Sequence, residues 1–390
     1  MSFSGSSVAI FVNCAIRCSM SMPAHSFPGD ARGPGGTVAR ASVSRTLSAR
    51  VRGTCRVPFG VPSAVPDPAL ATDLAGLTLR SPVVLAAGTA GVLDEVGDVL
   101  PLDTLGAITT KSLTAAAREG NPTWRILPTR GGMLNAIGLS NPGIDAFCAH
   151  VAPRIARLPV PIIASVAGFS IDDYVRVAAR LDELPALGAI ELNVSCPNVH
   201  GGTDFGVDPK ALGELVRALR PVCSQTRLFV KLSPVVIGSP SIAALARICV
   251  EPPGASETSG PNGRPGADAL CVSNTIPAMS IDVRTRRPRL ANRTGGLSGP
   301  GIHPAIVKLV HDVYRGVGQP TETPIVAIGG VLSWEDAAEF ILAGASAVGI
   351  GTALFADPRT PTKITRGLNK WVRAQGAGSI QELIGAAELA

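Results

Sequence analysis

The sequence lacks several features that would assign a chain to a class directly. It has no apolar run close to the ~18 residues that a transmembrane helix needs. Its eight cysteines form no CxxC pair, its five histidines form no HExxH motif, and no GxGxxG follows the first predicted strand. These absences argue against a membrane span, a metal site, a disulfide framework and a dinucleotide-binding fold. With 46% hydrophobic and 16% charged residues, the chain as a whole is neither disordered nor a coiled coil.

Basic residues are unevenly distributed along the chain. The net charge of +6 comes from residues 1–66, which hold seven arginines, no lysine and one acid, Asp30. The remaining residues carry 28 basic and 28 acidic side chains, so no basic face for nucleic acid is expected. An arginine- and serine-rich, acid-poor leader is typical of a transit peptide. We therefore predict an organelle location, in the chloroplast rather than the mitochondrion. A leader that is not a transit peptide would instead indicate a cytoplasmic protein.

Short apolar runs alternate with amphipathic stretches from about residue 67 onward. The runs predict eight strands, near 83–87, 106–110, 161–166, 189–194, 228–232, 268–273, 325–328 and 346–350. Helical patterns lie between them, for example at 171–184 and 333–344. In the second of these, Ser333 and Asp336 have the spacing of a capping box.

This alternation predicts the fold class. Eight βα units over about 300 residues have the size of a (β/α)8 TIM barrel, an α/β fold. We expect residues 67–390 to form it as a single domain, after a disordered N-terminal extension at 1–66. The Pro-, Gly- and Ser-rich segment 251–267 is predicted to be a mobile insertion.

Polar residues and glycines follow the predicted strands at their C-terminal ends, where the active site of a TIM barrel lies. The residues at these ends are Lys111, Asn193, Cys196, Lys231, Asn274, Thr275, Gly329, Gly330, Gly351 and Thr352. Glycines after the last two strands let backbone N–H groups approach a phosphate. Either glycine pair alone could be an ordinary turn. Both pairs together, at these two strand ends, favour a phosphate-bearing cofactor.

Two strand-end lysines permit more than one role. Lys231 ends the apolar strand FVKLSP, where a lysine is costly to bury without a partner. Over a flavin, such an ammonium would stabilise negative charge at the N1–C2=O edge of the reduced ring. A barrel lysine can also form a Schiff base or extend its ammonium to solvent. Lys111 in ITTKSLT has the same strand-end position, and neither lysine is decisive by itself.

The stretch ELNVSCPNVHGG at 191–202 combines a cysteine with amides, a hydroxyl and paired glycines. A free cysteine is most often an inert buried residue. In this setting, however, the thiolate of Cys196 can act as a base, and the glycines let the loop close over a substrate. In NAIGLSNPG at 135–143, Asn135 and Asn141 are either turn residues or substrate contacts.

Seven motifs occur in a fixed order along the body of the chain: NAIGLSNPG, ELNVSCPNVHGG, VKLSP, SNTIPAMSIDVRTRRP, GGLSGPGIHP, AIGG and GASAVGIGTALF. In this combination the sequence resembles the class 1 dihydroorotate dehydrogenase family over about residues 72–385. It is closer to the NAD-linked 1B branch than to the fumarate-using 1A branch. The resemblance implies a flavoprotein, with FMN at the top of the barrel, that oxidises (S)-dihydroorotate to orotate in de novo pyrimidine (UMP) biosynthesis.

The resemblance also implies roles for individual residues. Cys196 would remove a proton from carbon 5 of dihydroorotate, while the hydride from carbon 6 would go to N5 of FMN. The substrate would be held by Lys111, Asn135, Ala136, Ile137, Gly138, Leu139, Asn193, Asn198, Asn274 and Thr275. FMN would be held by Ala87, Lys111, Ser112, Ser165, Asn193, Lys231 and Ser273, with its phosphate among Gly299, Gly329, Gly330, Gly351 and Thr352.

Three residues depart from the family's pattern. Ser165 replaces an asparagine, Ala87 a frequent serine, and Ser273 an apolar residue under the flavin, and these changes would weaken FMN contacts. The chain holds neither a cysteine cluster for iron–sulfur nor a dinucleotide fingerprint. The resemblance therefore implies an iron–sulfur and FAD partner subunit that passes electrons to NAD, or a soluble oxidant such as fumarate, a quinone or oxygen. A homodimer core is also expected.

Two alternatives remain open at this point. One is a related FMN barrel that acts on another cyclic amide, such as a dihydropyrimidine; the asparagines of SCPN and NAIGL favour a substrate with a carboxylate instead. The other is a non-catalytic barrel kept as a binding subunit. The presence of Cys196 and Lys231 argues against it, and a colourless preparation would support it.

Overall fold

Eight parallel strands close into a barrel in the computed structural model, which describes residues 67–195, 205–255 and 260–388. In order around the barrel these are β10 (Ala269–Val272), β15 (Ile325–Ile328), β16 (Ala347–Ile350), β3 (Val83–Leu85), β4 (Ala107–Thr109), β7 (Ile162–Val166), β8 (Ala189–Asn193) and β9 (Arg227–Lys231). The predicted TIM barrel is confirmed, and each strand begins and ends within two residues of the sequence-based expectation. The predictions for the leader at 1–66 lie outside the described residues.

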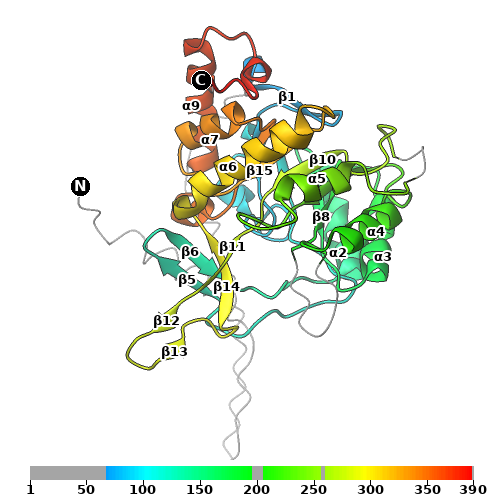
Figure 1. The fold of residues 1–390 in the computed structure, drawn as a ribbon, viewed down its shortest axis with the longest axis vertical. Helices are drawn as coiled ribbons and strands as arrows, with labels where there is room; N and C mark the ends of the chain where they lie inside the picture. The colour runs from blue at the N-terminus through cyan, green and yellow to red at the C-terminus, as the bar shows by residue number, and fades with distance from the viewer. Residues whose placement is uncertain (1–66, 196–204, 256–259, 389–390) are drawn as a thin grey trace, which may run out of the picture. The chain divides into compact units, whose positions relative to one another are not determined.

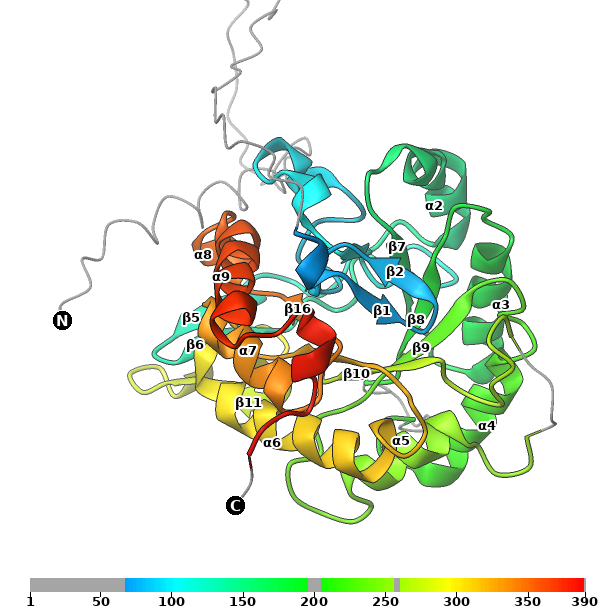
Figure 2. The same cartoon turned by 90° about the horizontal axis from the view of Figure 1, so that it is seen from above.

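Helices surround the strands (Figures 1 and 2). They are α2 (Ile144–His150), α3 (Ile171–Asp182), α4 (Pro209–Leu219), α5 (Ile242–Val250), α6 (His303–Val313), α7 (Trp334–Leu342), the short α8 (Ala353–Ala356) and α9 (Thr360–Ala374). Several begin at a side-chain cap that satisfies otherwise unpaired backbone N–H groups. The capping box predicted at Ser333 and Asp336 is confirmed at the start of α7.

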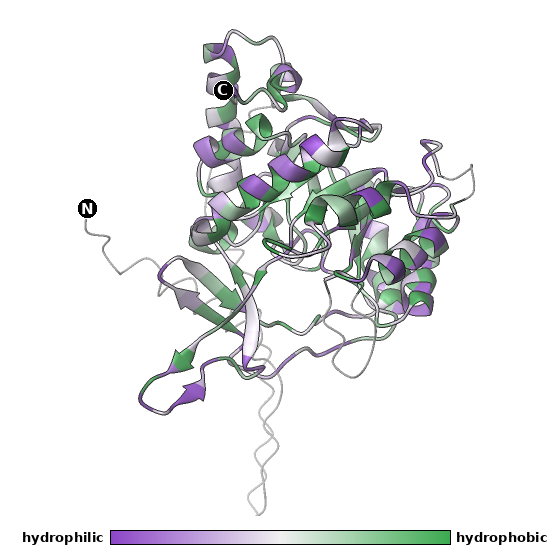
Figure 3. Cartoon of the chain, in the orientation of Figure 1, coloured by the Kyte–Doolittle hydropathy of each residue, from purple (hydrophilic) through white to green (hydrophobic). Residues whose placement is uncertain are grey.

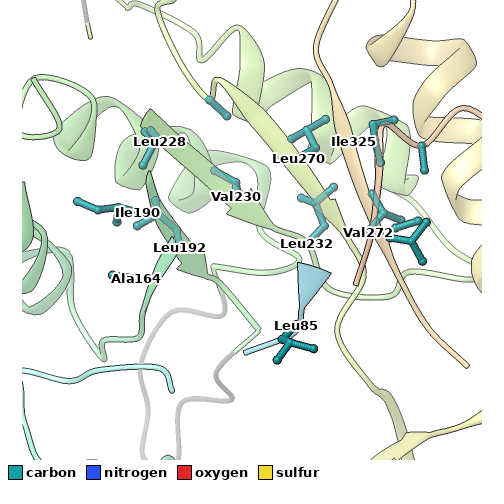
Figure 4. Close-up of a cluster of buried hydrophobic side chains, with 14 of the residues drawn as sticks. Leu85, Ala164, Ile190, Leu192, Leu228, Val230, Leu232, Leu270, Val272 and Ile325 are labelled. Carbon is teal, nitrogen blue, oxygen red and sulfur yellow. The ribbon is translucent and has the colours of Figure 1, made fainter. Parts of the chain in front are cut away.

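The barrel strands pack differently on their two faces. Side chains such as Ile190 and Leu192 belong to the large buried cluster between strands and helices (Figure 4). Ala189 belongs to a separate buried cluster inside the barrel. Because side chains alternate along a strand, Glu191 and Asn193 share the inward face of β8 with Ala189. The strands are correspondingly hydrophobic through most of their length (Figure 3).

A hairpin of β1 (Thr72–Leu74) and β2 (Leu77–Leu79) lies across the N-terminal end of the barrel (Figure 2). Leu74 and Leu79 pack with Val84 and Phe229 in the interior cluster, so the hairpin closes this end with apolar side chains. The barrel is therefore a packed core, and the space for a ligand lies at its opposite end.

A second, antiparallel sheet stands beside the barrel, and the sequence pattern did not predict it. Its strands are β5 (Ile126–Thr129), β6 (Gly132–Asn135), β14 (Thr294–Ser298) and β11 (Ile276–Met279), and a two-stranded extension of β12 (Ile281–Asp282) and β13 (Arg287–Pro288) follows (Figure 1). Three residues separate the end of β10 from the start of β11. The sheet is therefore connected directly to the C-terminal end of the barrel.

Three buried charged side chains stabilise the outer layer of the barrel. Arg220, at the end of α4, donates to the Asp268 carboxylate at 2.7 Å, and both side chains are fully buried. Asp182, at the end of α3, accepts hydrogen bonds from the backbone N–H and hydroxyl groups of Ser224 and Thr226. Each buried charge thus has a partner, as burial in a low-dielectric interior requires.

The predicted insertion at 251–267 is described except for residues 256–259. Asn262 donates to the carbonyl oxygen of Ala75 at 2.9 Å, and Arg264 donates to that of Thr321 at 3.1 Å. These contacts hold the second half of the segment against the N-terminal end of the barrel, whereas the predicted mobility stays a prediction. No helix within the described ranges is long and apolar enough to cross a membrane.

Candidate active site

A chain of hydrogen bonds runs along the C-terminal ends of four barrel strands. The hydroxyl groups of Ser112 and Ser165 are 2.9 Å apart, and Asn193 Nδ2 donates to Ser112 Oγ at 3.4 Å. Asn274 Nδ2 donates to Asn193 Oδ1 at 3.0 Å, and the Thr275 N–H donates to Asn274 Oδ1 at 2.8 Å. The structure therefore brings these five sequence-predicted residues together from β4, β7, β8 and β10.

Both predicted lysines lie at this end of the barrel. Lys231 is the last residue of β9, in register with Asn193, and its side chain is buried inside the barrel. Lys111 follows β4 and its side chain extends toward the end of β3, because a Cβ added to Gly88 would lie 2.9 Å from Lys111 Nζ. Ala87, which precedes Gly88, is half-buried.

The second sheet adds the NAIGL residues to the same region. Asn135, at the end of β6, donates to the Gly296 carbonyl of β14 at 3.3 Å, and a Cβ on Gly296 would collide with the Thr275 side chain. Asn135 and Thr275 therefore flank the same glycine. Only a residue without a side chain fits at position 296 between them.

The loop from Ala136 to Leu139 is fixed by hydrogen bonds to the segment that follows Lys111 and Ser112. The Ala136 and Ile137 carbonyls both accept hydrogen bonds from Asn121, and Asn141 Oδ1 accepts one from the Thr114 N–H at 3.2 Å. Gly138 and Leu139 both adopt left-handed φ angles, +75° and +56°. A leucine rarely adopts that conformation, so the surrounding contacts must impose it.

Glycines form a cradle where β15, β16 and α6 meet. Gly330 has φ +75°, and a Cβ there would lie 2.7 Å from the Gly299 carbonyl oxygen. Gly299 has φ +100° and lies at the start of the turn that leads into α6. Gly351 follows β16, whose Ile350 carbonyl accepts from the Ala86 N–H at the end of β3. The positive end of the α6 dipole and bare backbone N–H groups give this cradle the chemistry of a phosphate site.

His303, the first residue of α6, is a member of this region that sequence reasoning missed. Its Nδ1 lies 2.9 Å from the Gly329 carbonyl oxygen and its Nε2 lies 3.1 Å from Glu339 Oε2. The ring therefore ties α6 to the turn after β15 and to α7. The motif GGLSGPGIHP contains this histidine, but Gly299 is the one residue of the motif that the sequence analysis assigns to the site.

Some predicted site residues are not tested by the geometry. Cys196 and Asn198 lie outside the described residues. The chain just before them is anchored, because the Ser195 N–H donates to Asn193 Oδ1 at 3.3 Å and its hydroxyl accepts from Ser233 at 2.9 Å. Thr352 is the N-cap residue of the short helix α8, and its carbonyl accepts a hydrogen bond from the Phe355 N–H.

Two of the residues that depart from the family's pattern have partners of their own. Ser165 is fully buried and hydrogen-bonded to Ser112, as described above. Ser273 donates its N–H to the Ile328 carbonyl at 3.1 Å and its hydroxyl to the Asn274 carbonyl at 3.0 Å. Both hydroxyls are therefore satisfied within the protein.

A closed parallel barrel with amides, two lysines and a glycine cradle at the C-terminal ends of its strands defines a TIM-barrel enzyme. Comparison with known proteins narrows this class. The family model for dihydroorotate dehydrogenase matches residues 69–372. The dihydroorotate dehydrogenase B (NAD(+)) catalytic subunit of Pelobacter propionicus is 44% identical over 322 residues, which are 82% of this chain and 99% of that protein. The subunit of the same name from Trichlorobacter lovleyi is 45% identical over the same shares.

A solved structure supports the fold. The crystal structure of DHODH from Eimeria tenella in complex with ferulenol superimposes with a TM-score of 0.66 at 22% identity, covering 85% of this chain and 91% of that one. The chain belongs to the dihydroorotate dehydrogenase family, in its 1B branch. It is an FMN-dependent oxidoreductase that oxidises dihydroorotate to orotate in pyrimidine biosynthesis. The resemblance seen in the sequence is thus confirmed.

The predicted organelle location is wrong. The relatives that match 82% of the chain are bacterial catalytic subunits, and nothing in the comparisons indicates an import signal for a chloroplast or a mitochondrion. The prediction rested on composition alone. A segment rich in arginine and serine and poor in acids is not specific enough to identify a transit peptide.

Proposed function

We propose that the hydrogen-bonded residues at the strand ends, which we call the rim, and the glycine cradle together form the FMN and dihydroorotate site of this enzyme. The observation that carries the proposal is the continuous chain from Ser165 through Ser112 and Asn193 to Asn274. It places amide and hydroxyl groups from four strands on one surface, with Lys231 and Lys111 beside it. Such convergent polar groups at the C-terminal ends of barrel strands are typical of a binding site.

The residues of the site fit FMN. Gly330 and Gly299 approach each other so closely that a Cβ on Gly330 would fill the space between them, and this arrangement leaves backbone groups open to a phosphate. The other residues proposed to hold FMN are Ala87, Lys111, Ser112, Ser165, Asn193, Lys231, Ser273, Gly329, Gly351 and Thr352. When bound, FMN supplies the two-electron acceptor for the hydride of carbon 6.

The substrate is proposed to lie between the rim and the second sheet. Asn193 and Asn274 offer amide donors and acceptors to the pyrimidine ring, and Lys111 offers a positive charge to the carboxylate. Asn135 to Leu139, Asn198 and Thr275 complete the contacts in this proposal. Lys231 stabilises the negative charge that arrives with the electrons.

Cys196 is proposed as the base that takes the proton from carbon 5. A free thiol has a pKa of about 8.5, so a base that works near pH 8 needs only modest tuning. The anchored Ser195 precedes Cys196 directly and lies next to Asn193, which supports a place for the thiol beside the rim. A proton taken by the thiolate balances the hydride that leaves carbon 6.

The electrons are proposed to leave through a partner subunit. The relatives are named as NAD(+)-linked catalytic subunits, and a catalytic subunit implies another subunit. By the same resemblance this partner carries an iron–sulfur cluster and FAD, because the sequence has neither a cysteine cluster nor a dinucleotide fingerprint. The full chain alone should therefore reduce its flavin with dihydroorotate but turn over slowly with NAD.

The catalytic core is proposed to be a homodimer of residues 67–390. The second sheet and its extension expose the apolar side chains of Ile126, Met279 and Ile281, which a second copy of the chain would cover. Sedimentation of the purified chain should give twice the monomer mass. Ile281→Asp should shift the mass toward the monomer, and a wild-type chain that sediments as a monomer would contradict the proposal.

Anaerobic mixing of the FMN-loaded full chain with dihydroorotate tests the site assignment. Dihydroorotate should reduce the bound FMN rapidly, so that the flavin absorbance near 450 nm is lost roughly completely. Cys196→Ala should stay yellow and bleach at least about 100-fold more slowly, the usual scale of a lost general base. Cys148→Ala, a half-buried cysteine on α2, is the matched control and should bleach normally. An undiminished rate in Cys196→Ala would remove this cysteine from the mechanism.

A further inference from the structure

Glu191 is a buried acid that the proposed site does not use. It lies on β8, only 2% exposed, and its Oε1 has no hydrogen-bond partner within the described part of the chain. A buried carboxylate is costly unless another charge compensates it. Its presence on the inward face of the barrel therefore calls for a nearby positive group.

Strand register shows which positive group is near. Glu191 is in register with Ser165 on one side and Phe229 on the other, and Lys231 is the next inward residue after Phe229. The interior around Glu191 is apolar, with Phe229 and Ala269 at its level and Ala189 one inward position nearer the N-terminal end of the barrel. Glu191 thus lies one inward position nearer the N-terminal end of the barrel than Lys231, between the apolar interior cluster and the rim.

The other buried charges of the described chain have partners elsewhere. Arg220 pairs with Asp268, and Asp182 accepts hydrogen bonds at the end of α3. Of the five buried Asp, Glu, Lys and Arg residues, this leaves Glu191 and Lys231, both inside the barrel. They are not within 4 Å of each other, since no ion pair joins them in the described ranges.

Cys271 shows that both charges act on the same small volume. It lies on β10, in register with Lys231, and is fully buried. Burial raises the pKa of the Cys271 thiol well above its ordinary range, and the charge of Glu191 raises it further while that of Lys231 lowers it. The charges of Glu191 and Lys231 therefore both act on the Cys271 thiol.

We infer that Glu191 is a positioning residue that lowers the reduction potential of the bound flavin by offsetting the charge of Lys231. This inference rests on the proposed contact between Lys231 and FMN. A lone ammonium at the flavin stabilises its electron-rich reduced form, whereas a fixed carboxylate behind it in a low-dielectric interior opposes that stabilisation. A flavin that passes its electrons on to NAD needs a low reduction potential. The charge of Glu191 keeps the reduction potential low.

The reduction potential of the FMN-loaded full chain tests the inference. It is measured by equilibration with a reference dye, at one fixed pH for all variants. Glu191→Gln keeps the shape and removes the charge, so the equilibrium should move at least about tenfold toward reduced flavin, a rise of about 30 mV for a two-electron couple. Glu191→Asp keeps the charge and should stay near the wild-type potential. Asp182→Asn, a buried acid far from the site, should also leave it unchanged.

A second background separates this inference from the proposed function. Lys231→Met should lower the potential, whereas Lys231→Arg keeps the positive charge. Adding Glu191→Gln to Lys231→Arg should raise the potential by the same tenfold step, a comparison that also serves if Glu191→Gln alone loses its FMN. If Lys231→Met lowers the potential but Glu191→Gln changes it less than twofold in either background, the role of Glu191 is refuted. If Lys231→Met leaves the potential unchanged, the proposed contact of Lys231 with FMN fails instead.

Discussion

The substitution Gly351→Ala tests FMN binding separately from the stability of the fold. Gly351 follows β16 in the proposed phosphate cradle, and its φ is not left-handed. A Cβ there would find its nearest neighbours, Ala86 Cβ and Thr89 Cγ2, both at 3.9 Å, which is ordinary van der Waals contact. The protein itself can therefore accept the methyl group without strain.

The expected effect on stability is accordingly small and that on FMN binding large. The free energy of unfolding of the apoprotein should change by less than about 0.5 kcal/mol, the usual range for an unstrained substitution. A methyl group that keeps a phosphate oxygen from the Gly351 N–H removes one charge-assisted hydrogen bond, worth about 1.5–3 kcal/mol. This is a loss of about 10- to 100-fold in FMN affinity.

Two other glycines provide the controls. Gly330→Ala should lower both stability and FMN affinity, because its φ is +75° and its Cβ would lie 2.7 Å from the Gly299 carbonyl. Gly213→Ala, on α4, adds the same methyl group far from the site, with its nearest neighbour at 3.4 Å. Quenching of FMN fluorescence gives the affinity and urea unfolding gives the stability. FMN affinity within twofold of wild type in Gly351→Ala would refute the position of the phosphate.

Three further substitutions test the site and the scaffold. Asn135→Ala should raise the KM for dihydroorotate by about tenfold, the value of one lost hydrogen bond of ~1.4 kcal/mol, without changing the flavin spectrum; an unchanged KM contradicts the substrate contact. Arg220→Met should lower the free energy of unfolding by about 3–5 kcal/mol because it leaves the buried charge of Asp268 without its cationic partner, and the double variant with Asp268→Leu should regain most of it in urea titrations. Burial raises the pKa of Asp182, but hydrogen bonds from Thr226 and its neighbours outweigh it and hold that pKa below the usual value. The stabilisation by ionised Asp182 is therefore present above about pH 4 and is lost as the pH falls through the lowered pKa. Asp182→Asn should accordingly reduce the loss of unfolding free energy at acid pH. An unaltered slope of the unfolding free energy between about pH 4 and pH 2 contradicts this prediction.

The barrel could be predicted from sequence because its signals are local. A buried parallel strand such as β10 or β15 is a continuous run of apolar residues, and a polar residue or a glycine follows directly after its end. The same is true of the capping box at Ser333, where two side chains three residues apart satisfy the helix start. These features need no knowledge of distant parts of the chain.

The second sheet could not be predicted in this way. β14 contains Gly295 and Gly296 and has no apolar run, and its partner β6 lies about 160 residues earlier in the chain. Only the folded chain shows that Asn135 and Thr275 flank the same glycine. The role of His303 was missed for a similar reason, since its contacts are a carbonyl after β15 and an acid on α7.

The amino-acid sequence by itself determined the class of fold, the ends of the barrel strands and the family. Apolar periodicity and a fixed order of motifs are properties of the chain that do not depend on its path. Only the tertiary structure decided how the rim is joined and which charges share the interior. Ser112, Ser165, Asn193 and Asn274 are far apart in sequence, and they form one hydrogen-bonded chain because closing the barrel brings their strand ends together. The position of Glu191 behind Lys231 likewise follows from strand register, which no single segment specifies.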